Sequence, residues 1–175
     1  MIRTASRSFA AALAALLLSG AAQAAPPSEK DRAELAAVMV AADDAWNAKD
    51  ADAMAGIYAE DGSIAITPNG QVFAGRETIR GLFTRNFAAR KDEARHLSST
   101  QHVDMLTPDL AQVDAQVRVE VKDAAGNWTL ARYFVNTSVA VRQKDGWKIR
   151  TVRANLRPIE EAAKAQAAVP VPAKG

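Results

Sequence analysis

The chain has 175 residues, with 22 Lys and Arg, 20 Asp and Glu, and no Cys. The lack of Cys excludes disulfides, thiolate metal sites and cysteine nucleophiles. Basic and acidic residues are interleaved along the chain, which argues against the basic face that nucleic-acid binding needs.

The first 24 residues have the pattern of a bacterial signal peptide. Arg3 and Arg7 form a basic start, an apolar stretch follows, and residues 22–24 (Ala-Gln-Ala) fit the cleavage pattern before Ala25. The uncharged stretch is short for a spanning helix, and retention as an N-terminal anchor is the alternative. Cleavage predicts a periplasmic or secreted protein with no membrane insertion after processing. It also leaves 20 basic and 20 acidic residues, because the two arginines are the only charges in the leader.

Three helices are predicted in the first half of the processed chain. Ser28 is a predicted N-cap, and apolar residues at helical spacing follow it to about Ala48. Asp50 is expected to cap a second, short helix that carries Met54, Ile57 and Tyr58. The third helix runs from Arg76 to about Ala89, with its apolar residues on one face.

The segments between and after these helices alternate with a period of two residues, which is typical of strands. Asn69-Gly70 predicts a hairpin between residues 63–67 and 71–73. Longer strands are predicted at about residues 94–105, 111–122, 128–143 and 147–157. The expected fold class is α+β, a cone-shaped, curved antiparallel sheet with the three helices on its concave face.

The domain is expected to span residues 25–158. The Ala/Pro-rich tail at residues 159–175 is expected to be disordered.

Two runs of sequence resemble the nuclear transport factor 2-like superfamily, particularly its SnoaL-like and ketosteroid-isomerase-like branches. They are AWNAKDADAMAGIYAEDGSIAITPNG at residues 45–70 and FAGRETIRGLF at residues 73–83. They contain a Trp-x-x-x-Asp helix end, a Tyr-Ala-x-Asp turn and a Gly-Arg-Glu helix start at the spacing of that superfamily. Residues 132–156 are similar to its closing hairpin. The resemblance covers residues 28–158 and implies the cystatin-like roll, a fold that hosts enzymes, binding proteins and assembly modules.

The resemblance does not extend to the isomerase's catalytic residues. It places the general-base Asp at Ile66 or Thr67, the oxyanion-hole Tyr near Ala42 and the protonated acid near Val139, and none of these is retained. Proton abstraction beside a carbonyl needs a base and donors for the oxyanion. Steroid isomerisation by that machinery is therefore not expected.

Strand parity, anchored on the resemblance, separates the two faces of the sheet. Ten residues are predicted to point inward: Ile64, Ile66, Val113, Ala115, Val117, Val119, Tyr133, Val135, Thr137 and Val139. Five charged residues are predicted to point outward: Asp114, Arg118, Glu120, Arg132 and Arg142. An interior without carboxylates or Arg argues against epoxide-hydrolase and dehydratase chemistry, both of which occur in this superfamily.

The residues left inside describe an apolar pocket with a few neutral hydrogen-bonding groups. Eight are predicted to bind a ligand: Trp46, Tyr58, Phe83, His96, Ser98, Thr100, Tyr133 and Thr137. The ligand is expected to be small, mostly apolar and uncharged, with no cofactor and no metal. His96 is the candidate catalytic residue, and the alternatives are a ligand-orienting group or a core histidine.

His102 and Asp104 share the parity of His96 if their strand is regular. A bulge near Gln101 would turn both residues outward and direct Val103 and Met105 to the core. Without the bulge, His96, His102 and Asp104 would form one face and could approach a dehydratase-like set.

Three functions follow from these patterns. The first is binding of a small apolar ligand, with or without a lyase or isomerase-type reaction. The second is an oligomeric assembly module whose cup is filled by its own side chains, as the resemblance to the calmodulin-dependent kinase association domain implies. The third is a dehydratase or cyclase, which depends on the unbulged strand. Large residues on the predicted outer face, Trp128, Phe134, Arg132 and Arg118, predict a homodimer through that face.

Overall fold

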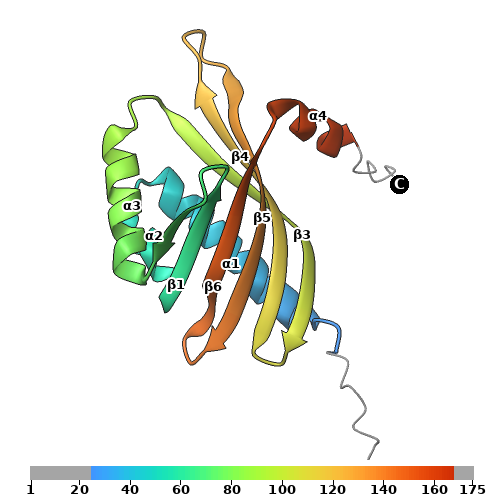
Figure 1. The fold of residues 1–175 in the computed structure, drawn as a ribbon. Helices are drawn as coiled ribbons and strands as arrows, with labels where there is room; N and C mark the ends of the chain where they lie inside the picture. The colour runs from blue at the N-terminus through green and yellow to red at the C-terminus, as the bar shows by residue number, and fades with distance from the viewer. Residues whose placement is uncertain (1–24, 168–175) are drawn as a thin grey trace, which may run out of the picture.

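The computed structural model describes residues 25–167, so the predicted signal peptide lies outside the described residues and stays a prediction. The elements follow in the order α1 (Glu29–Asn47), α2 (Ala51–Gly56), β1 (Tyr58–Thr67), β2 (Gln71–Ala74), α3 (Arg76–Ala89), β3 (Ala94–Thr107), β4 (Leu110–Lys122), β5 (Trp128–Gln143), β6 (Gly146–Arg157) and α4 (Ile159–Ala167) (Figure 1). None of the helices within residues 25–167 is long and apolar enough to cross a membrane.

The strands form one curved, open sheet in the order β2-β1-β6-β5-β4-β3. The α+β class with helices against a curved sheet is as predicted. One pairing differs from the predicted antiparallel arrangement, because β1 and β6 run parallel to each other. The sheet is therefore mixed, with the N-terminal hairpin added beside the last strand.

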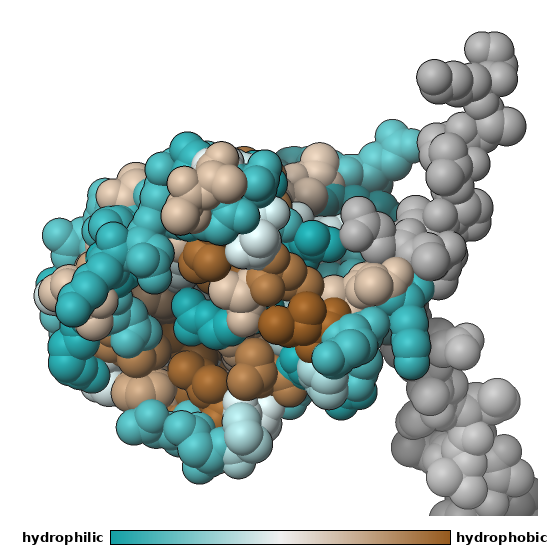
Figure 2. Space-filling model, turned by 90° about the horizontal axis from the view of Figure 1, so that it is seen from above, coloured by the Kyte–Doolittle hydropathy of each residue, from teal (hydrophilic) through white to brown (hydrophobic). Residues whose placement is uncertain are grey.

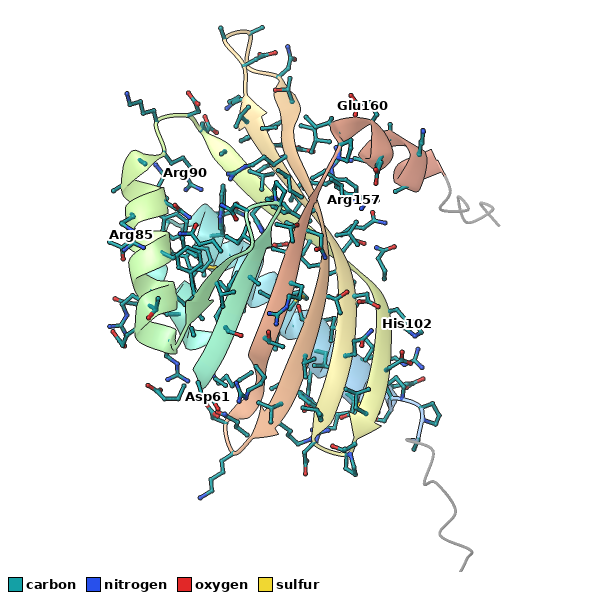
Figure 3. The ribbon with its side chains drawn as sticks, in the orientation of Figure 1. Asp61, Arg85, Arg90, His102, Arg157 and Glu160 are labelled. Atoms are coloured by element: carbon teal, nitrogen blue, oxygen red, sulfur yellow. The ribbon has the colours of Figure 1, made fainter. Side chains whose placement is uncertain are left out.

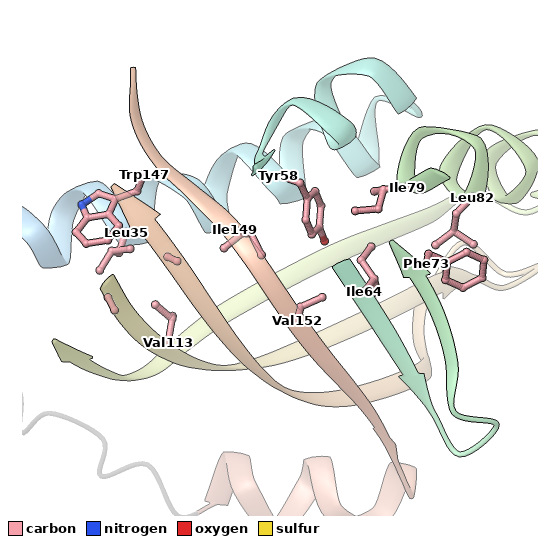
Figure 4. Close-up of a cluster of buried hydrophobic side chains, with 12 residues drawn as sticks. Leu35, Tyr58, Ile64, Phe73, Ile79, Leu82, Val113, Trp147, Ile149 and Val152 are labelled. Atoms are coloured by element: carbon pink, nitrogen blue, oxygen red, sulfur yellow. The ribbon is translucent and has the colours of Figure 1, made fainter. Parts of the chain in front are cut away.

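Helices α1, α2 and α3 lie on the same side of the sheet, and the main hydrophobic core fills the space between them and the strands (Figures 1 and 4). Ser28 caps α1, where its hydroxyl accepts from Asp31 N at 3.1 Å. Leu35 of α1 packs with Val113 and Trp147 at one end of this core, and all three side chains are buried. The apolar face predicted for the first helix is therefore the face that meets the sheet.

The second helix is shorter than its apolar pattern indicated. Asp50 caps α2 by accepting from Ala53 N at 2.8 Å, and the helix ends at Gly56. Tyr58, expected to continue the helix, instead begins β1, where it pairs with Ile149 of β6. The strand thereby brings the Tyr58 ring into the core (Figure 4).

A fourth helix occupies part of the tail that was expected to be disordered. Helix α4 lies against the convex face of the sheet, on the side opposite the core (Figure 4). Its Ala162 is buried, and Tyr133 of β5, 2% exposed, lies on the face that α4 covers. The prediction of disorder is therefore wrong for residues 159–167, and residues 168–175 lie outside the described part of the chain.

Candidate functional site

A cavity of about 200 Å³ lies between the helices and the concave face of the sheet. Its wall is mostly apolar, with Met39, Leu82, Phe83, Val117 and Val152 among the residues that form it. Viewed from above in Figure 2, hydrophobic side chains gather in a hollow surrounded by hydrophilic ones. The volume is below the roughly 300–1,000 Å³ of drug-sized ligand sites, so the space suits a smaller molecule.

His96 of β3 is a polar group in the cavity wall and pairs with Asp43 of α1. The His96 Nδ1 atom lies 2.6 Å from Asp43 Oδ1, and the two side chains are 16% and 18% exposed. Ser98 donates to the same carboxylate twice, from its backbone N and from its hydroxyl, each at 2.7 Å. Because the carboxylate accepts all these bonds, Nδ1 is the donor in the His96 pair. The second ring nitrogen, Nε2, has no hydrogen-bond partner within residues 25–167 and is left available to the cavity.

Helix α1 also fixes the backbone of His96. Asn47, one helical turn after Asp43, accepts from His96 N at 2.7 Å and donates to His96 O at 3.1 Å. Residues four apart lie on one face of a helix, so both polar side chains reach the same point of β3. The Trp46 ring lies 5.3 Å from the imidazole, tilted by 33°. The orientation of His96 is therefore set from three sides.

Five of the eight residues predicted to bind a ligand lie in the cavity wall: Trp46, Tyr58, Phe83, His96 and Ser98. Thr100 lies on the same face of β3, paired with Ala115, but outside the wall. Tyr133 and Thr137 lie on the opposite face of the sheet. Tyr133 is on the face covered by α4, and the Thr137 hydroxyl donates to Asp114 at 2.7 Å.

The predicted parity of β5 was wrong by one residue. Paired residues of neighbouring antiparallel strands share a face, and Phe134 pairs with Val117 while Asn136 pairs with Ala115. The inward set of β5 is therefore Arg132, Phe134, Asn136 and Ser138, all of which line the cavity. Their neighbours Tyr133, Val135, Thr137 and Val139, predicted to point inward, point outward.

Among the five charged residues predicted to point outward, two do not. Arg132 lines the cavity, and Arg142 lies on the helix side, where it pairs with Asp31 and Glu34 of α1. Asp114, Arg118 and Glu120 are on the outer face, as predicted, since they alternate with inward residues of β4. Arg132 and Phe134 therefore no longer support the outer face as an interface, and the homodimer stays a prediction.

The bulge predicted near Gln101 is present. Thr100 pairs with Ala115 and His102 with Asp114, so Gln101 is an extra residue in β3. The bulge turns His102 and Asp104 outward, where their side chains are 62% and 56% exposed and lie 3.0 Å apart. Val103 packs against the core instead. The unbulged face of His96, His102 and Asp104 is therefore wrong.

Sequence reasoning missed Asp43, because it looked like one more residue on the solvent face of the first helix. It also missed Asn136, whose Oδ1 atom is buried without a hydrogen-bond partner. Tyr58, 6% exposed, adds a hydroxyl to the cavity wall, and burial raises its pKa above the ordinary value. The phenol therefore stays protonated and can donate. Within residues 25–167, no three His, Asp or Glu side chains gather in a way that could hold a metal ion.

This combination of a curved open sheet, helices on its concave side and a cavity between them defines the nuclear transport factor 2-like superfamily. Within it, the chain belongs to the SnoaL-like domain family, which matches residues 28–153. None of the curated proteins compared with the chain matches it.

Solved structures share the fold at low sequence identity. A domain of unknown function with a cystatin-like fold from Nostoc punctiforme has a TM-score of 0.66 at 18% identity, covering 80% of this chain and 86% of its own. A putative calcium/calmodulin dependent protein kinase II association domain from Xanthomonas campestris has 0.62 at 22%, covering 78% and 95%. A ketosteroid isomerase-like protein from Erwinia carotovora atroseptica has 0.60 at 16%, covering 75% and 99%. At these identities the likeness shows the fold alone.

Proposed function

We propose that the cavity binds a small, mostly apolar molecule and that His96 exchanges a proton with it in a lyase or isomerase-type reaction without a cofactor. The observation that carries the proposal is the 2.6 Å bond between His96 Nδ1 and Asp43 at the cavity wall. A carboxylate that fixes one ring nitrogen as a donor leaves the other as the proton acceptor.

The surroundings of His96 support this role. The wall of this space of about 200 Å³ is mostly apolar. Tyr58 offers a hydroxyl donor and Asn136 offers a buried acceptor. A ligand with an oxygen and an acidic C–H or a hydroxyl leaving group would find a base and hydrogen-bonding partners in the same cavity.

The proposal differs in one respect from the dehydratase expected from an unbulged strand. The carboxylate that accompanies His96 comes from α1, as Asp43, and not from Asp104 of β3. A non-catalytic assembly role is supported only by likeness of fold to the association domain. No contact within the described residues favours it over ligand binding.

The test is proton exchange at carbon, followed by NMR in D2O with 2-indanone as the probe. The wild-type protein should accelerate deuterium incorporation beside the carbonyl, and His96→Gln should lower that acceleration by about 100-fold or more. His102→Gln is the matched control, because its exposed ring lies outside the cavity, and it should leave the rate unchanged. Equal rates for the wild type and His96→Gln, with both proteins folded, would overturn the catalytic role.

A further inference from the structure

Arg132 is a charged residue in the wall of a mostly apolar cavity. It lies on the inward face of β5, opposite Val119, and its side chain is exposed at the mouth. Within residues 25–167, no carboxylate forms an ion pair with it, and no other group bonds its guanidinium. A cavity that binds only uncharged ligands would not require a guanidinium group in its wall.

A second guanidinium lies close by. Arg90, directly after α3, stacks on the Trp46 ring with its Cζ atom 4.1 Å from the ring centroid. Its terminal nitrogens lie 3.3 and 3.4 Å from Trp46 O, while its Nε atom is buried with no partner. Burial and the positive charge of Arg132 lower the pKa of Arg90. The two cations are therefore near enough to repel each other.

Arg90 and Arg132 are two neighbouring cations, and within residues 25–167 no ion pair neutralises their charge. Guanidinium groups bind carboxylates through two parallel N–H bonds, and these charge-assisted bonds are stronger than neutral ones. Trp46 connects Arg90 to the cavity, because Arg90 stacks on its ring and the ring is part of the wall, which Arg132 lines directly. An anion bound at this point could be the charged end of a molecule whose apolar part fills the cavity below.

We propose that the ligand is a small hydrophobic carboxylic acid, whose carboxylate binds Arg132 and Arg90 at the mouth while its apolar part fills the cavity. The inference rests on the proposed function and specifies its mostly apolar ligand as one that carries a carboxylate. His96 then acts on the part of the acid that lies inside, away from the carboxylate.

The test compares two molecules of the same shape, 3-phenylpropanoate and 3-phenylpropanamide, as probes. Their affinities are measured by titration of backbone and Trp46 indole NMR signals. We expect the carboxylate to bind the wild type about tenfold tighter than the amide, and Arg132→Gln to remove the difference by weakening only the carboxylate. Arg132→Lys keeps the charge without the paired donors and should retain part of the preference.

Arg85→Gln is the control for general electrostatics. Figure 3 shows Arg85 on the body of α3 and Arg90 where that helix ends. Arg85 is exposed and not part of the cavity wall, so its loss removes one positive charge from the same helix without touching the proposed site. The carboxylate preference should be unchanged in this variant.

The two proposals fail in different ways. Equal binding of acid and amide to the wild type, with shifts at Trp46, would overturn the carboxylate inference and leave apolar binding in place. A preference that persists in Arg132→Gln would assign it to another group and also overturn the inference. Absence of binding by either molecule at millimolar concentration would overturn apolar binding in this cavity as well.

Discussion

Both histidines of the chain lie on β3, and each is paired with an aspartate, but their surroundings are opposite. His96 and Asp43 are enclosed between α1 and the cavity. His102 and Asp104 lie six residues further along the strand and are mostly exposed; Figure 3 shows His102 at the outer edge of the sheet. The extra residue Gln101 separates them and reverses which side chains face inward. The register of the strand therefore decides which His–Asp pair can act on a ligand, because only one of the two pairs faces an enclosed space.

The two pairs also differ in what the aspartate does. Asp104 contributes one exposed contact, and such surface pairs stabilise a protein little, because water screens them. Asp43 accepts from three donors on two residues of a neighbouring element. It joins α1 to the sheet and at the same time orients His96.

The largest effect should come from removing the charge of each aspartate in turn. Asp43→Asn replaces an acceptor with an amide N–H that faces the donors of His96 and Ser98, and should lower the free energy of unfolding by about 2–3 kcal/mol. Asp104→Asn should lower it by less than about 0.5 kcal/mol. Urea unfolding followed by tryptophan fluorescence measures both, and equal losses would contradict the distinction.

A smaller effect is expected from removing the bulge. Deletion of Gln101 lets His102 follow Thr100 directly, still opposite Asp114, so that Val103 keeps its place in the core. The free energy of unfolding should change by about 1 kcal/mol or less, and both pairs should keep their surroundings. Unfolding measurements with an NMR check of Val103 would show this. A loss as large as that of a core substitution would mean that the bend of the strand, and not only its register, is required.

The third prediction concerns which ring nitrogen of each histidine carries the proton, and it involves no change in stability. His96 donates from Nδ1 to Asp43, whereas it is the Nε2 atom of His102 that lies 3.0 Å from Asp104 Oδ1. At a pH where both rings are neutral, long-range ¹H–¹⁵N NMR spectra should therefore show opposite tautomers. A proton on Nε2 of neutral His96 would remove the orientation on which its proposed role depends.

Most of the fold was predictable, because local signals agreed with each other. Periodicity gave the helices and strands, Asn69-Gly70 gave the hairpin, and the mismatch of Val103 with a regular strand gave the bulge. The parallel pairing of β1 with β6 could not be predicted, because it joins segments about 90 residues apart that carry no local signal for it.

The errors on β5 have one origin. The parity of β5 was anchored on the family resemblance, which placed Tyr133 in the interior and so moved Arg132 and Asn136 to the wrong side. The Ala-rich segment of α4 was expected to be disordered, but it forms a helix over part of the convex face of β5. Tyr133 is instead buried on the face that α4 covers.

The hydrogen bonds from α1 to β3 have a second consequence, for the edge of the sheet. β3 is the last strand, and an edge strand with open backbone groups can recruit a strand from another molecule and start aggregation. At His96 and Ser98 these groups are already bonded to Asn47 and Asp43. The two side chains occupy the position that an intruding strand would take, so the residues that orient the imidazole also protect this end of the sheet from self-association.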